Sequence, residues 1–181
     1  MKKIIVFSDS HKETSLMRQV TSNLLSSKMF DFCAIIHLGD HRSDAICLQE
    51  SGLPVYAVPG NCDTDLANSG QPQQSLSILK TSDPAVGEII NRPHALIEIA
   101  GVKILITHGH RYNVKSSYMS LCYKAREMGA DACLFGHTHI PCEFDYENIK
   151  FLNPGSVKYG KTYGILTIDN CQIYTSVVKA K

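Results

Sequence analysis

The chain has 181 residues, of which 44% are hydrophobic and 19% charged, values that are ordinary for a folded domain and argue against disorder. Its 18 Lys and Arg residues against 17 Asp and Glu residues give a formal charge of +1, so we expect neither a general nucleic-acid binder nor a protein drawn to anionic membranes. The seven cysteines are odd in number and contain no C-x-x-C pair, which argues against a zinc ribbon and against a disulfide framework.

The N-terminal third alternates short apolar runs with a helical pattern. The first run, Ile4–Phe7, is too short for a signal sequence or a membrane span, so we expect a buried strand and a cytoplasmic protein. Leu16, Val20 and Leu24 follow at helical spacing. We predict strands over Lys3–Ser8, Cys33–Leu38 and Pro54–Val58, and helices over Glu13–Met29 and Asp44–Glu50. This order of elements indicates a parallel sheet with crossover helices.

The next segment, residues 63–93, is rich in Ser, Gln, Asn, Pro and Gly and is long for a loop. Loops of this length are uncommon unless they are functional or disordered, and the functional interpretation is a lid or a contact in a homo-oligomer. Beyond it we predict strands over Ala95–Ala100, Val102–Thr107, Ala132–Phe135, Glu143–Tyr146, Lys150–Leu152, Tyr163–Ile168 and Gln172–Val178, and a helix over Ser116–Met128. No repeat or linker interrupts the pattern, so we expect one α/β domain over residues 1–181.

Polar residues of the kinds that bind metals follow five of the predicted strands. They are Asp9-Ser10-His11, Gly39-Asp40, Gly60-Asn61-Cys62-Asp63, His108-Gly109-His110 and Gly136-His137-Thr138-His139. Ligands of parallel α/β sheets bind outside the carboxyl ends of the strands, so we expect these loops to share one rim. Each motif alone occurs in ordinary turns. Together, and in this order, they indicate a metal centre.

The number and kind of these side chains favour two ions over one. Carboxylate, imidazole and amide groups suit divalent ions such as Mn²⁺, Zn²⁺ or Fe²⁺, whereas thiolates would select softer ions. The candidate ligands exceed what one such ion takes. A carboxylate between two cations about 3.5–4 Å apart would bridge them and screen their repulsion.

The order of the motifs, followed by Asn153-Pro154-Gly155-Ser156, resembles the calcineurin-like metallophosphoesterase superfamily. Within it the chain is most similar to the small prokaryotic phosphodiesterases, to which a eukaryotic retromer subunit is also similar. The resemblance covers nearly the whole chain. It implies a four-layer α-β-β-α sandwich with a dinuclear metal site at the carboxyl ends of the strands.

Carried over by motif, the resemblance implies a role for each candidate ligand. Asp9, His11 and His139 would bind a first metal, Asp40 would bridge, and Asn61, His108 and His137 would bind a second. Asn61 would also contact a phosphate oxygen. The favoured ion is Mn²⁺, with Zn²⁺, Fe²⁺ or Ni²⁺ as alternatives, and the implied nucleophile is a metal-bridging hydroxide that attacks phosphorus in line.

The chain departs from the larger members of the superfamily at one catalytic position. Those members carry a histidine after Gly-Asn, a proton donor to the leaving group, whereas Cys62 stands there in this chain. A thiol is a weak hydrogen-bond donor. His110, beside the predicted ligand His108, is then the nearby candidate for this catalytic role.

The sequence therefore predicts a metal-dependent phosphodiesterase that acts on a small or nucleotide-like phosphate ester. A non-catalytic scaffold of the same fold is a first alternative, less favoured because every candidate ligand position keeps a metal-competent residue. A phosphomonoesterase or protein phosphatase is a second. It is less favoured because the motifs have no basic cluster to neutralise a dianion, Arg42 and Arg111 being the nearest cations.

Overall fold

The first of two sheets joins the N-terminal strands to the last two strands of the chain. The structure is a computed structural model and describes residues 1–63 and 90–180. The strand order is β10-β9-β1-β2-β3, with β1, β2 and β3 parallel and with β9 and β10 antiparallel to their neighbours. The strands span Lys2–Phe7 (β1), Asp31–His37 (β2), Val55–Ala57 (β3), Thr162–Asp169 (β9) and Gln172–Lys179 (β10).

The second sheet is built from the strands between these two groups, in the order β4-β5-β6-β8-β7. Its three central strands are parallel, and the edge strands β4 and β7 are antiparallel to them. The strands span His94–Ile99 (β4), Val102–Thr107 (β5), Ala132–Leu134 (β6), Cys142–Tyr146 (β7) and Ile149–Asn153 (β8). The lid or interface predicted for residues 63–93 falls almost entirely outside the described residues.

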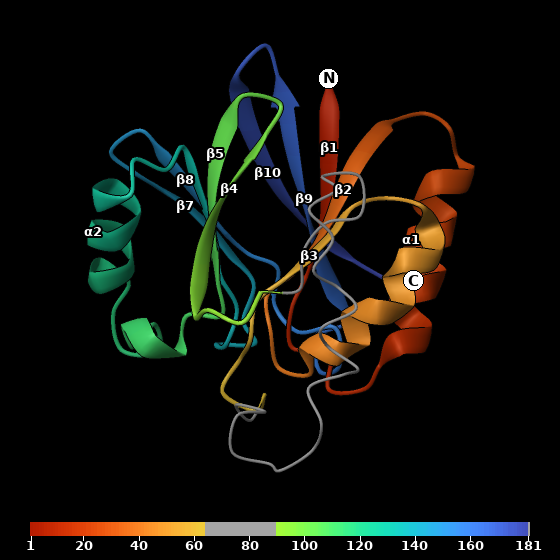
Figure 1. Cartoon of the computed structure of the whole chain (residues 1–181), viewed down its shortest axis with the longest axis horizontal. Helices are drawn as coiled ribbons and strands as arrows, with labels where there is room; N and C mark the ends of the chain where they lie inside the picture. The colour runs from red at the N-terminus through yellow and green to blue at the C-terminus, as the bar shows by residue number, and fades with distance from the viewer. Residues whose placement is uncertain (64–89, 181) are drawn as a thin grey trace.

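Helices cover the outer face of each sheet (Figure 1). The α-helix Thr14–Ser26 (α1) and the 3-10 helix Arg42–Ser51 (η1) cover the first sheet, and the α-helix Met119–Glu127 (α2) covers the second. The helix predicted over Asp44–Glu50 therefore exists, but as a 3-10 helix between two left-handed residues, His41 and Gly52.

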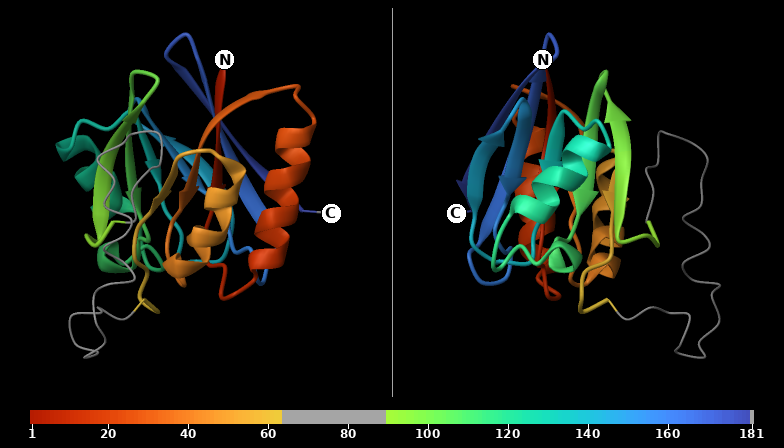
Figure 2. Two further views of the ribbon diagram at one scale, coloured as in Figure 1. Left: turned by 45° about the vertical axis from the view of Figure 1, so that its right-hand side comes forward. Right: turned by 90° about the vertical axis from the view of Figure 1, so that its left-hand side faces the viewer.

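Alternate side chains of the central strands pack into different clusters, which divide the apolar interior into three layers. In β1, Ile4 and Val6 pack between the two sheets, whereas Ile5 and Phe7 pack against α1 and η1. In β5, Leu105 packs toward α2. Successive side chains of a strand point to opposite faces, so each central strand must be apolar throughout. The result is the predicted four-layer α-β-β-α sandwich, which Figure 2 shows from two further sides.

All seven cysteines are free thiols, as their odd number and spacing predict. Within residues 1–63 and 90–180, no helix is long and apolar enough to cross a membrane.

The layer between the sheets should dominate stability. We expect Ile104→Ala, which removes a fully buried side chain between the sheets, to lower the free energy of unfolding by about 2–5 kcal/mol. The matched control Ile46→Ala, at a side chain 43% exposed on η1, should cost about 1 kcal/mol or less. Urea unfolding followed by circular dichroism measures both, and equal losses would contradict this assignment of the core.

Candidate metal centre

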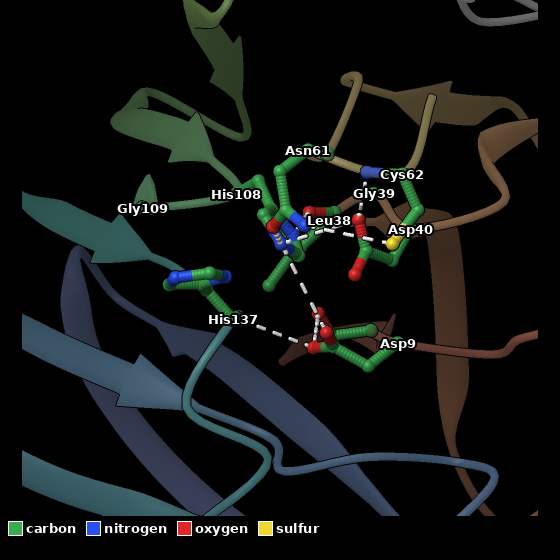
Figure 3. Close-up of polar contacts among 12 residues, drawn as sticks. Asp9, Leu38, Gly39, Asp40, Asn61, Cys62, His108, Gly109 and His137 are labelled. Carbon is green, nitrogen blue, oxygen red and sulfur yellow. Dashed lines mark hydrogen bonds and ion pairs between the residues drawn. The ribbon is translucent and has the colours of Figure 1, made fainter. Parts of the chain in front are cut away.

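The loops that follow the parallel strands of both sheets meet at one end of the sandwich and are tied together there (Figure 3). The Asp9 backbone N–H donates to the Gly39 carbonyl at 3.1 Å, and the His137 N–H donates to Asp9 Oδ2 at 3.1 Å. The Cys62 N–H donates to Asp40 Oδ1 at 2.8 Å. These bonds hold the carboxylates of Asp9 and Asp40 at the junction of the two sheets.

One group of side chains at this junction has the geometry of a metal site. Ligand atoms of Asp9, His11, Asp40 and His139 all lie within 4.8 Å of one another. Asp9 Oδ1 and His11 Nε2 are both buried, and neither finds a hydrogen-bond partner among the residues that the structure describes. Buried polar atoms without partners are costly. A divalent cation among these atoms would satisfy them, so the residues present fit a metal.

A second group shares Asp40 with the first. The His108 Nδ1–H donates to the Leu38 carbonyl at 2.8 Å, which leaves Nε2 with its lone pair free. That lone pair faces Asn61 Oδ1 at 3.1 Å and Asp40 Oδ1 at 3.4 Å. In the neutral form of His108, which its lowered pKa favours, three acceptor atoms thus converge. A cation would turn this repulsive arrangement into a coordination shell.

The remaining predicted site residues line the second group. The ring centroid of His137 lies 5.1 Å from that of His108, and the centroid of His110 lies 5.4 Å from that of His108. His110 Nδ1 is buried and has no hydrogen-bond partner within the described part of the chain. The structure therefore brings all the predicted ligands and His110 to one place. Their individual roles as ligands or catalysts stay predictions.

Several of these side chains stand on left-handed backbone. The φ angles of five non-glycine residues lie between 42° and 70°: Asp9, His11, Asp40, His137 and His139. This region costs energy for residues with a Cβ. The hydrogen bonds between the loops compensate for this cost.

Two glycines allow the loops to approach each other closely. A Cβ on Gly60 would overlap Asp40 Oδ1, and a Cβ on Gly136 would overlap Ser8 Oγ and approach Asp9 Oδ2 to 2.8 Å. Only glycine avoids such contacts.

Three further side chains support these loops, none of them among the predicted ligands or catalytic residues. Ser8 Oγ donates to Asp9 Oδ2 at 2.5 Å, and Ser156 Oγ donates to the Asp9 carbonyl at 2.9 Å. His37, fully buried, accepts from the Gly39 N–H and pairs with Ser10 Oγ at 3.0 Å. Serines that flank Asp9 or close the Asn153–Ser156 motif were the available signal.

Burial sets the charge state of the site. It raises the pKa of the Asp9 carboxyl to about 6. It lowers the pKa values of His108, His137 and His139 from their ordinary range, which keeps these imidazoles neutral near pH 7. Neutral imidazole is the form that binds metals.

The cations and the thiol near the site are less available than the sequence alone suggests. The buried Arg42 guanidinium donates to the Ile90 carbonyl and to Asn91 Oδ1, both at 2.8 Å, and so serves packing. Arg111 is exposed on the short 3-10 helix His110–Tyr112. The pKa of the Cys62 thiol is raised to about 11 by desolvation and by the neighbouring Asp40.

Known proteins are similar to this chain in sequence and in fold. Residues 1–171 match the family model described as the calcineurin-like phosphoesterase superfamily domain. The probable metallophosphoesterase YsnB of Bacillus subtilis (strain 168) is 27% identical over 173 residues, which are 92% of this chain and 85% of that protein.

Two solved structures share the fold over nearly their whole length. An archaeal phosphodiesterase superimposes with a TM-score of 0.71 at 21% identity, over 97% of this chain and 99% of its own. Vps29 of Entamoeba histolytica in complex with Zn²⁺ superimposes with a TM-score of 0.64 at 17% identity, over 99% of both chains. At these identities the likeness shows the fold alone.

The four-layer sandwich and the Asp/His cluster at its strand ends define a metallophosphoesterase fold with the cluster typical of that class. Since the family model spans almost the whole sequence, the chain belongs to the calcineurin-like phosphoesterase superfamily. The resemblance inferred from the ordered motifs is confirmed, and so is the similarity to a eukaryotic protein of the same fold.

Metal affinity should depend on pH through Asp9. Because the pKa of this carboxyl is about 6 without metal, a proton competes with the ion at lower pH. We expect the Kd for Mn²⁺ to rise by up to roughly tenfold per pH unit below that value, and to level off above it. Calorimetric titration of metal-stripped protein between pH 5 and 8 measures this, and a Kd independent of pH would contradict it.

Proposed function

We propose that this chain is a metal-dependent phosphodiesterase that hydrolyses a small or nucleotide-like phosphodiester with two divalent ions, Mn²⁺ being favoured. The observation that carries the proposal is the pair of acceptor groups that share Asp40, each short of a positive charge. The fold common to this chain and an archaeal phosphodiesterase supports it.

Each group of residues would hold one ion. Asp9, His11 and His139 would hold the first and His108, His137 and Asn61 the second, with Asp40 between them. Ions there would activate a water molecule and neutralise the charge that develops on the phosphoryl oxygens. When Asn61 Oδ1 faces an ion, its Nδ2–H is left to donate to a phosphate oxygen, which would orient the ester.

The pairing of the buried arginine near the site favours a diester over a monoester, with the exposed Lys115 as the cation whose charge acts on His137 and His139. A phosphate monoester carries about two negative charges near neutral pH, and a diester carries one. The buried Arg42 is bound to Ile90 and Asn91, so it is not free to neutralise the second charge. The two cations then suffice for a monoanionic substrate.

A scaffold role is the competing candidate, and metal binding alone does not separate the two. The Vps29 structure that shares this fold contains Zn²⁺. Turnover is therefore the deciding measurement, and it should be sought with a panel of diesters, monoesters and cyclic nucleotides after Mn²⁺ is added to metal-stripped protein.

The shared carboxylate should be indispensable. We expect chelation to abolish diester hydrolysis, Mn²⁺ to restore it, and elemental analysis of loaded protein to approach two ions per chain. Asp40→Asn should lose more than about tenfold in kcat, a barrier increase above ~1.4 kcal/mol, because the amide lacks the negative charge and the second oxygen of the common ligand. Full activity with a single bound ion would contradict the proposal. An Asp40→Asn variant that folds normally and keeps more than about a tenth of the wild-type kcat would also contradict it.

The leaving group should limit the rate because Cys62 is a poor acid. With its thiol pKa near 11, it supplies little of the roughly 10²–10⁴-fold that general acids contribute. We expect aryl diesters, whose leaving groups are stable as anions, to react far faster than alkyl diesters. Cys62→Ala should cost little with aryl substrates.

His110 is the matched variant in this experiment, since its buried Nδ1 is the nearby group able to carry the proton. His110→Ala should slow alkyl diesters more than aryl diesters. A plot of log kcat/KM against leaving-group pKa measures both effects. A flat plot, with product release excluded as the slow step, would show that a competent acid protonates the leaving group. The prediction that leaving-group departure limits the rate would then be wrong.

A further inference from the structure

An exposed tyrosine lies directly against the candidate metal centre. The Tyr159 ring stacks on the His139 ring, with 5.2 Å between centroids and 21° between planes. Its centroid also lies 5.4 Å from that of His11. Both histidines belong to the group that gathers around Asp9. Although one side of the ring is stacked, 67% of the residue surface is exposed.

The position of this ring is fixed by the same loop that supports Asp9. The Tyr159 N–H donates to Ser156 Oγ at 3.0 Å, and that hydroxyl donates to the Asp9 carbonyl at 2.9 Å. The N–H groups of Gly160 and Thr162 both donate to the Ser156 carbonyl, which closes the turn. Tyr159 is therefore set at a defined place beside the site and does not sit on a free loop.

Two residues next to the stacked pair in the chain differ in what they can offer a ligand. Ile140, which follows His139 in the chain, is 70% exposed. Lys158, which precedes Tyr159, pairs with Glu13 at 3.7 Å. An exposed aromatic ring beside a phosphate-binding centre is suited to a planar group, because stacking needs only a second π-face.

We propose that Tyr159 is a stacking platform for a planar aromatic group, aryl or nucleobase, attached to the phosphate of the substrate. The proposal rests on the function proposed above and narrows its substrate class. A phosphate ester held at the group of Asp9, His11 and His139 would carry its ester substituent past the ring that stacks on His139. A ring there gains contact area that a small alkyl group cannot.

Binding of product-like monoesters tests the platform without turnover. The probes are phenyl phosphate and methyl phosphate, which share the phosphate and differ in the ring, measured by calorimetry on Mn²⁺-loaded protein. Tyr159→Ala should raise the Kd of phenyl phosphate roughly 5- to 20-fold and change that of methyl phosphate by no more than about twofold. Tyr159→Phe should keep the wild-type Kd values, since the platform needs the ring and not the hydroxyl.

Tyr174→Ala is the matched control. This tyrosine is 53% exposed on β10, paired with Thr167 near the opposite end of the first sheet, and should leave both Kd values unchanged. Adenosine 5′-monophosphate is the second arm of the experiment. If Tyr159→Ala weakens it as it weakens phenyl phosphate, the platform takes a nucleobase. If only phenyl phosphate is affected, it takes an aryl group.

Three results would overturn the proposal. Equal losses for phenyl and methyl phosphate would mean that Tyr159 acts only by packing His139. An unchanged Kd for phenyl phosphate, or wild-type protein that does not prefer it over methyl phosphate, would exclude the platform. If the loaded protein hydrolyses no diester but holds phenyl phosphate through Tyr159, the proposed function fails and the subsite stands. Diester hydrolysis with binding insensitive to Tyr159 removes the subsite alone.

Discussion

Oxygen and nitrogen lone pairs are concentrated at one end of this molecule without the protons needed to satisfy them. The carboxylates of Asp9 and Asp40 are almost completely buried, and His108 turns its only N–H away, toward a backbone carbonyl. Burial of charged or polar atoms is tolerated when they are paired or bound to a metal. The conformations of the surrounding loops keep these acceptor atoms buried and orient them toward the same positions.

The loops meet this demand by local distortion on a rigid frame. Five loops begin at one rim, at the carboxyl ends of the parallel strands, but ordinary extended backbone would turn successive side chains to opposite faces of the sheet. Left-handed residues such as Asp40 and His137 redirect the chain, and Gly60 and Gly136 allow the loops to touch. The regular sheets thus make the frame rigid, and the irregular turns orient the side chains of the site.

The sequence predicts the frame well because periodicity reports burial directly. The apolar run Ile4–Phe7 is buried on both faces, and the polar motifs after such runs could be assigned to one rim. Contacts with the backbone and contacts between residues far apart in the chain cannot be predicted in this way. The bond from His108 to the Leu38 carbonyl leaves no trace in residue types, and Tyr159 meets His11 across a long sequence separation. Nothing in its local sequence separates it from an ordinary surface tyrosine.

The site also joins the two sheets. Asp9, His11 and Asp40 follow strands of the first sheet, whereas His108 and His139 follow strands of the second. An ion bound by residues of both groups would cross-link the two sheets, next to the apolar layer that packs between them. The free energy of ion binding would then add to the free energy of unfolding. The temperature of unfolding would rise with the concentration of free metal. Supply of metal in the surroundings would thus govern how long the folded protein persists, quite apart from what it catalyses.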